Sequence, residues 1–263
     1  MPPRPAPELF DTELRALRRD RAARQGPELF VFERAFADCL DRLSLMQRPF
    51  GRALLIGAPD RQWPARLGAL AGQVDVADPG PLFAQAAAGQ RIVEDAWEPP
   101  VEAYDLVVTV GTLDTVNDLP RALLAIRRAM KAESLFLAAL SGGETLPRLR
   151  AAMREADALG GTATPHVHPR IEAAALSPLL ASVGFVNAVV DVDRLAVSYR
   201  SFRRLVEDLR RMAGTNLLLQ RSRQSLSKRA YAAAAASFAS AGDGERTVET
   251  FEILHFACWS PAR

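Results

Sequence analysis

The 263-residue chain is predicted to fold as an α/β domain, a doubly wound mixed sheet of seven strands, and two observations lead to this prediction. First, short apolar runs ending in small or acidic residues alternate with segments long enough for a helix or an extended crossover, which is typical of a parallel sheet. Second, two later runs have the composition or alternation of strands, and the last is expected to insert antiparallel beside the others. The expected strand order is 3-2-1-4-5-7-6, with right-handed crossovers.

Two helices are expected before the sheet, over residues 8–24 and 28–46. In the second helix, apolar residues recur at spacings of three and four and form one buried stripe, namely Phe32, Phe36, Leu40 and Leu43. The first helix carries a basic cluster, which consists of Arg15, Arg18, Arg19, Arg21 and Arg24. We interpret this cluster as a solvated helix face, and the alternative is a surface for an acidic partner.

Five apolar runs are expected to form the parallel strands: RALLIG (52–57), QVDVAD (73–78), RIVED (91–95), YDLVVTV (104–110) and SLFLAAL (134–140). A helix is expected from Glu144 to the Gly160–Gly161 pair, since glycine commonly ends helices. A short helix over 172–183 then precedes the two late strands, over 185–199 and 247–261.

Two further helical stretches are expected over 201–240. Together with the N-terminal helices they could cover the strand ends as a helical cap. The expected division of the chain is therefore: 1–48, N-terminal helices and part of the cap; 49–200, cofactor-binding core; 201–245, helical insertion and part of the cap; 246–263, the final strand of the core sheet.

Composition excludes several classes of protein. The 33 basic and 31 acidic residues leave a net charge of +2, which is too balanced to favour nucleic acid or an anionic membrane as the main partner. The two cysteines, Cys39 and Cys258, indicate neither a disulfide framework nor a zinc site, so a reducing cytoplasm is expected. No secretion signal is recognised, and no apolar run reaches the roughly 18 to 20 residues of a membrane span.

The ends of the second and third strands carry acids suited to a nucleoside cofactor. In a doubly wound sheet the ligand lies outside the carboxyl ends of the strands, where an acid after the second strand can bind ribose hydroxyls and a polar group after the third can meet the base. Asp78 closes QVDVAD and Asp95 closes RIVED. Either acid alone could equally be a helix cap or a turn residue.

The loop after the first strand, ALLIGAPDRQ (53–62), departs from a glycine-rich pattern. Gly57 and Ala58 bring the backbone close to a ligand, but Pro59 fixes φ and removes one N–H donor. Arg61 could bind an anionic group and Asp60 could cap the next helix, so side chains could replace the missing backbone contacts. The alternative is a loop that no longer holds any ligand.

After the fourth strand, Gly111 and Asp114 are expected to line the floor of the cleft, and Asp114 is the candidate catalytic residue. Asn117 or Asp118 is expected to cap the following helix, because a proline at Pro120 suits its first turn.

Two other motifs have ordinary structural explanations. SGGETL (141–146) has the Ser-x-x-Glu spacing of a capping box, and its glycines would also permit close approach of a substrate. His166 and His168 could face one side as metal ligands, but without a third ligand nearby no metal site is expected. Hydrolase and phosphate-loop motifs are absent from the sequence.

The sequence resembles the class I S-adenosylmethionine-dependent methyltransferases, especially the branch of proteobacterial proteins and the mitochondrial complex I assembly factor with that fold. A more distant likeness is to the methyltransferase of biotin synthesis that esterifies a malonylated carrier protein. The segments that carry the resemblance are FDTELRALRRDRAAR, YDLVVTVGTLDTVNDLPRALLAIRRAM, LFLAALSGGETLPRLR, VDVDRLAVSYRSFRRLVEDLRRMAGTNLL and TFEILHFACWSP.

The resemblance implies a Rossmann-like methyltransferase fold with S-adenosylmethionine as cofactor. Gly57 and its neighbours would cradle its methionine part, Asp78 its ribose and Asp95 its adenine. Three departures from the family pattern stand out: Leu55 replaces an acid, Pro59 and Arg61 disrupt the glycines, and Asp114 with Thr115 replaces a His-Trp pair.

Two functions are therefore open. The first is a methyltransferase that acts on a protein or carrier-bound substrate presented under the cap, because methyl transfer requires positioning and no dedicated nucleophile. The second is a non-catalytic or hydroxylase-type assembly protein for a respiratory complex I subunit, which is the role the resemblance to the mitochondrial branch implies.

Overall fold

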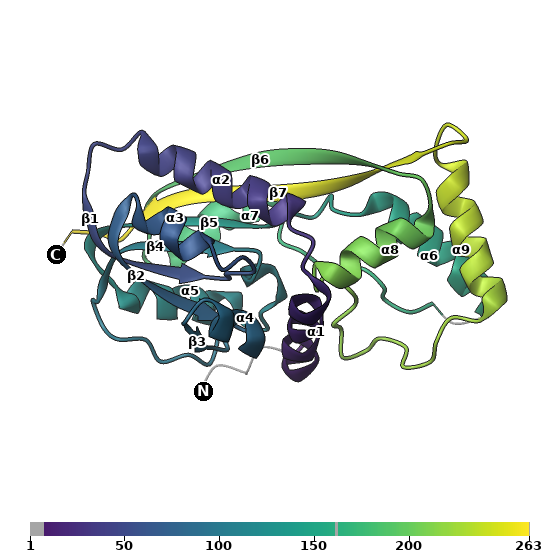
Figure 1. Ribbon diagram of the computed structural model, residues 1–263, viewed down its shortest axis with the longest axis horizontal. Coiled ribbons are helices and arrows are strands. Elements are labelled where there is room, and N and C mark those ends of the chain that lie inside the picture. Colours follow the sequence, from purple (N-terminus) through teal and green to yellow (C-terminus); the bar gives the residue numbers. More distant parts are fainter. Residues whose placement is uncertain (1–7, 161–162, 263) are drawn as a thin grey trace.

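A mixed seven-stranded sheet organises the protein, and its strand order β3-β2-β1-β4-β5-β7-β6 confirms the prediction (Figure 1). The computed structural model describes residues 8–160 and 163–262. The strands are β1 (Phe50–Ile56), β2 (Ala71–Asp78), β3 (Gln90–Arg91), β4 (Tyr104–Val110), β5 (Met130–Ser141), β6 (Val186–Tyr199) and β7 (Thr247–Trp259). The first five pair in parallel, whereas β7 runs antiparallel to both β5 and β6.

Helices connect these strands and cover both faces of the sheet (Figure 1). They are α1 (Thr12–Gln25), α2 (Phe30–Ser44), α3 (Trp63–Gly68), α4 (Pro81–Ala86), α5 (Leu119–Ala129), α6 (Pro147–Gly160), α7 (Ala173–Ser182), α8 (Phe202–Arg211) and α9 (Lys228–Ser240). Within the described ranges, none of them is long and apolar enough to cross a membrane.

Strand β1 shows why both faces of the sheet are buried. Its side chains alternate between two hydrophobic clusters: Ala53 and Leu55 pack on one face, and Leu54 and Ile56 pack on the other. All four are fully buried. A strand covered on both faces reads as a continuous apolar run, which explains the composition of the segment.

Helix α2 lies against the sheet and holds the start of α3, the helix that follows the loop after β1. Phe36 stacks on Trp63 with ring centroids 4.2 Å apart and an interplanar angle of 11°. The indole Nε1 of Trp63 donates a hydrogen bond to Glu33 at 2.9 Å. Both rings are fully buried, so Trp63 belongs to the core and does not enter the cofactor space.

Strands β6 and β7 extend beyond the rest of the sheet as a two-stranded ribbon. β5 pairs with β7 only between Ser141 and Leu135, whereas β6 stays paired with β7 as far as Tyr199 and Thr247. The ribbon leads to a group of helices, α6, α8 and α9 (Figure 1). We call this group the cap from here on; it differs from the expected cap because it includes α6, and because α2 packs against the sheet instead. Helix α1 lies between the sheet side and the cap, in contact with α4 and α8.

Two local predictions were wrong. The third strand comprises only Gln90–Arg91, so Asp95 lies in the turn beyond it. SGGETL does not form a capping box, because Ser141 still belongs to β5 and α6 begins at Pro147. The N-terminus of α6 is instead capped from the ribbon: the Glu249 carboxylate accepts hydrogen bonds from the backbone N–H groups of Arg148 and Leu149. Helix α6 reaches Gly160, and Gly161 lies outside the described residues.

Replacing Trp63 with alanine is expected to lower the free energy of unfolding by about 3 to 5 kcal/mol, because the change leaves a cavity against Phe36. Urea denaturation followed by circular dichroism measures this loss. Leu45→Ala, at a side chain that is 83% exposed, is the control and should stay within about 0.5 kcal/mol of the wild type. Equal effects of the two changes would contradict the core role of Trp63.

Candidate functional site

The acid at the end of β2 is buried and its hydrogen-bonding capacity is filled by the protein itself. Asp78 is fully buried, and its carboxylate receives the Nε and Nη2 groups of Arg19 at 2.8 and 2.6 Å. It also accepts the backbone N–H groups of Ala58 at 3.0 Å and Gly80 at 2.7 Å. A carboxylate has about four acceptor positions, so Asp78 has none left for ribose hydroxyls while Arg19 is in place.

A second arginine of α1 makes a parallel contact one helical turn earlier. Arg15 donates to the two oxygens of Glu94 at 2.7 and 2.8 Å, and to the carbonyl oxygen of Thr112 at 2.7 Å. Burial opposes the charge of Arg15, but the Glu94 carboxylate outweighs it and the pKa of Arg15 is raised. Arg15 and Arg19 thus hold α1 across the carboxyl edge of the sheet by two buried, bidentate ion pairs.

This arrangement corrects the interpretation of the basic cluster in the first helix. Arg15 and Arg19 are only 4% and 6% exposed, so they are not part of a solvated face. Their spacing of four residues was the available signal, since it places both guanidinium groups on one side of the helix. The sequence did not show that Glu94 and Asp78 would be their partners, because these lie 79 and 59 residues away.

The glycines expected to admit a ligand are packed against the protein. Gly57 has φ +87°, and a Cβ atom there would lie 2.5 Å from the carbonyl oxygen of Val110. Gly111 has φ +63°, and a Cβ atom there would lie 2.4 Å from the ring of Phe32. Both positions therefore require glycine for the approach of other parts of the chain, with no ligand involved.

The side chains of the 57–62 loop point to local structure. Asp60 accepts a hydrogen bond from the backbone N–H of Gln62, two residues on, which is the pattern of an Asx turn and not of a helix cap. Arg61 is exposed. Asp95 accepts the backbone N–H groups of Asn117 and Asp118, and Asp118 caps α5 as predicted.

Asp114 lies beside what remains of the cleft. The small cavity there has a volume of about 70 Å³, and Asp114 lines it together with Arg15, Arg19 and Arg170. Small-molecule sites usually have about 300 to 1,000 Å³. With Asp78 saturated and this volume remaining, the residues do not fit S-adenosylmethionine in the conformation that the structure describes.

The two histidines have separate structural partners. His166 Nε2 lies 2.8 Å from Asp157, whereas His168 is buried, packs edge-on against Phe10 and accepts the backbone N–H of Leu217 at Nε2. Burial lowers the pKa of His168 to about 3, with smaller effects from Arg170 and Arg18. Over residues 8–160 and 163–262, no group of three His, Cys, Asp or Glu residues is placed to hold a metal ion.

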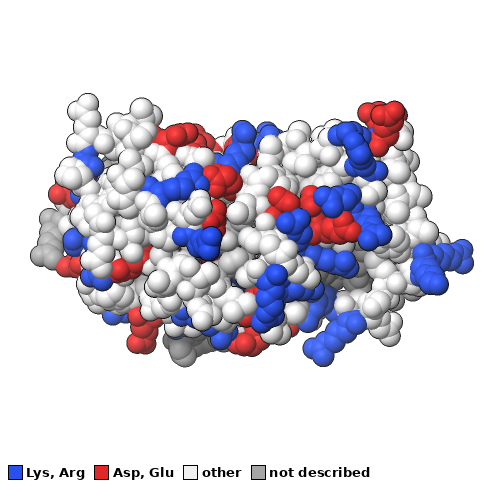
Figure 2. Space-filling view, in the orientation of Figure 1, with Lys and Arg blue, Asp and Glu red and all other residues white. Residues whose placement is uncertain are grey.

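A second basic cluster lies on α8 and comprises Arg203, Arg204, Arg210 and Arg211. It is solvated and largely paired. Arg203 and Arg204 both contact Glu207, and Arg211 lies near Glu28. Figure 2 shows basic and acidic side chains interspersed over the α8 region. This surface is therefore mixed in charge.

Comparison with known proteins identifies the family. None of the known protein-family models matches the chain. The mitochondrial arginine hydroxylase NDUFAF5 of Mus musculus is 30% identical over 274 residues, which cover 95% of this chain and 77% of the relative. The chain belongs to the NDUFAF5 family. A malonyl-[acyl-carrier protein] O-methyltransferase of Xylella fastidiosa is 28% identical over 65% of this chain and 57% of its own length.

Solved structures confirm that the NDUFAF5-family chain has the class I methyltransferase fold. The YcgJ protein of Bacillus subtilis aligns with a TM-score of 0.59 and 9% identity over 88% of this chain and all of its own. The N-methyltransferase NodS of Bradyrhizobium japonicum, in complex with S-adenosylhomocysteine, aligns with a TM-score of 0.52 and 15% identity over 95% of this chain and all of its own. At these identities the likeness concerns the fold.

Arg19→Ala is expected to lower the free energy of unfolding by about 3 to 5 kcal/mol, because it leaves the buried Asp78 carboxylate without its cation. Chemical denaturation at neutral pH measures the change. Glu13→Ala is the matched control on the same helix: Glu13 pairs with Arg91 at 3.2 Å but is 78% exposed, so its loss should cost at most about 1 kcal/mol. A loss below 1 kcal/mol for Arg19→Ala would show that the ion pair does not hold α1.

His168 predicts a specific pH dependence. Its pKa falls from 6.5 in the unfolded chain to about 3 in the folded protein, so between these values the unfolded state binds more protons. The stability that neutral His168 supports is fully present above about pH 6.5 and is lost progressively as the pH falls toward 3. In His168→Gln, the difference in unfolding free energy between pH 7 and pH 5 should shrink by about 1 to 2 kcal/mol. An unchanged difference would exclude His168 as the titrating group.

Proposed function

We propose that this protein is an assembly protein of the NDUFAF5 family that holds a subunit of respiratory complex I and does not transfer methyl groups. The observation that carries the proposal is the saturation of Asp78 by Arg19, Ala58 and Gly80. The acid that would bind the ribose of a nucleoside cofactor instead anchors α1.

The rest of the cleft supports the same conclusion. Arg15 and Glu94 form a second anchor one turn away. Pro59 removes an N–H donor from the loop after β1, and the ring of Phe32 fills the approach to Gly111. These features come from three separate segments: α1 and α2 fill space at the cleft, and the β1 loop lacks one N–H donor that could contact a cofactor.

A second candidate function is an S-adenosylmethionine-dependent methyltransferase that acts on a protein or carrier-bound substrate. The observation in its favour is that Asp78 and Gly111 occupy the carboxyl edge of the sheet, where the fold binds its ligands. The relatedness to a malonyl-carrier methyltransferase points the same way. In this alternative, α1 would have to leave the cleft before the cofactor enters, and Asp114 would be the candidate acid beside the acceptor.

Deletion of the gene in its native organism is expected to lower the amount of assembled complex I, as measured by native gel and by NADH:quinone oxidoreductase activity in membranes. The wild-type gene should restore both, because the protein supplies a surface that the subunit needs during assembly. Unchanged complex I in the deletion strain would contradict the assembly role.

Isothermal titration calorimetry with purified protein separates the two candidates. S-adenosylmethionine and S-adenosylhomocysteine at about 1 mM should give no binding heat and no rise in melting temperature, since a useful ligand stabilises by RT ln(1 + [L]/Kd). A methyltransferase from the same preparation scheme serves as positive control. A dissociation constant below about 100 μM for either ligand would overturn the proposal that the protein does not transfer methyl groups, and would favour the methyltransferase.

A further inference from the structure

The cap encloses a cavity that the proposed function does not use. It has a volume of about 430 Å³ and lies between α6, α8 and α9, next to the loop residues 214–216 and 225–226. This volume is within the range of about 300 to 1,000 Å³ that is usual for small-molecule sites. The cavity is therefore large enough for a ligand, in contrast to the remnant of the cofactor cleft.

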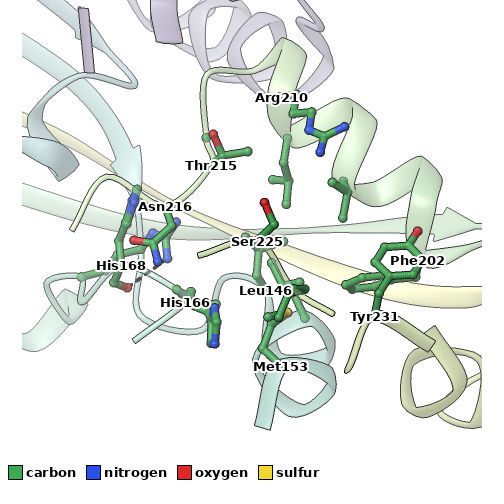
Figure 3. Close-up of a pocket in the computed structure, with 17 residues that line it drawn as sticks. Leu146, Met153, His166, His168, Phe202, Arg210, Thr215, Asn216, Ser225 and Tyr231 are labelled. Atoms are coloured by element: carbon green, nitrogen blue, oxygen red, sulfur yellow. Dashed lines mark hydrogen bonds between the residues drawn. The ribbon is translucent and has the colours of Figure 1, made fainter. Parts of the chain in front are cut away.

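Most of the wall is apolar, and several polar side chains lie at one end. Figure 3 shows His168 and Asn216 at one end of the cavity and Phe202 with Tyr231 at the other. Apolar side chains that line it include Leu146, Leu149, Met153, Val206, Leu209 and Leu226. A ligand for this space would have an apolar body and a polar end.

The charge of the wall is positive. Among the described residues that line the cavity, Arg170 and Arg210 are basic and none is acidic. The buried His168 is neutral at physiological pH because its pKa is lowered to about 3, and His166 is bonded to Asp157. The polar end of a ligand is therefore best matched by an anion.

Arg170 has a side-chain donor without a hydrogen-bond partner. Its Nε is buried and has no hydrogen-bond partner, and its Nη1 donates only a long bond of 3.3 Å to the carbonyl oxygen of His168. Burial lowers the pKa of Arg170, and Asp114, across the small cleft cavity that Arg170 also lines, partly opposes this effect without any hydrogen bond that the structure shows. A buried guanidinium with a free donor is costly unless a partner completes it.

We propose that the cap cavity binds an amphipathic carboxylate of medium chain length, with its carboxylate at Arg170 and its apolar chain between α6, α8 and α9. A carboxylate suits the planar fork of a guanidinium better than a spherical anion does. The site goes beyond the proposed assembly function.

Calorimetry and thermal shift with the full-length protein test the site with decanoate below its micellar concentration. Decanoate should bind and raise the melting temperature, whereas decanol and decyltrimethylammonium should bind at least about tenfold more weakly, because a hydrogen bond to a charged group is lost. Equal binding of the three, or no binding of decanoate, would overturn the proposal.

Two variants locate the site. Arg170→Gln should weaken decanoate at least about tenfold, whereas Arg210→Gln, which removes the same charge from an exposed position, should change affinity less than about threefold. Val206→Trp should abolish binding by filling the cavity, and Arg170→Lys should retain part of the affinity if Arg170→Gln fails to fold. Undiminished affinity in Val206→Trp would place the ligand elsewhere. The titration with S-adenosylmethionine reports on the cofactor cleft, whereas the titration with decanoate reports on the cap cavity. The outcome of one experiment therefore does not determine the outcome of the other.

Discussion

The ion pair between Arg19 and Asp78 connects the first helix to the edge of the sheet, and the shape of the cleft depends on it. Both side chains are buried, and removing either would leave the other as an unpaired buried charge. Two backbone N–H groups complete the carboxylate, so the pair also fixes the turns after β1 and β2. Helix α1 is thereby part of the core, and the place where the fold usually receives a nucleoside is built from the chain itself.

At the same edge, residues that were expected to contact a cofactor make contacts within the protein. Gly57, Gly111 and Asp78 stay at the positions where the methyltransferase fold has use for them, but each now contacts the protein. The glycines accommodate Val110 and Phe32, and the acid accommodates an arginine. Selection for these internal contacts is sufficient to retain the residues, so their presence in a sequence does not by itself demonstrate a ligand.

The sequence predicted the sheet well because its signals are local. Apolar runs such as YDLVVTV and the β-branched run before Tyr199 identify strands directly, and the alternation of strands with crossover segments led to the predicted order. The contacts of the site were harder to predict, because they join residues that are distant in sequence. The acids were found at strand ends, but nothing local to Arg15 or Arg19 shows a partner more than 50 residues away. The capping box failed for the same reason, since Glu249 reaches α6 from 100 residues further along the chain.

The ribbon of β6 and β7 has a consequence for how such proteins diversify. Tyr199 and Thr247 face each other as paired residues, so the intervening chain, with α8 and α9, leaves and re-enters the sheet at adjacent points. Segments whose ends lie close together tolerate insertion and replacement, because the framework around them keeps its register. The segment with α8 and α9 can therefore be exchanged as a module: one lineage can acquire a new binding surface there while the seven strands below remain as they are.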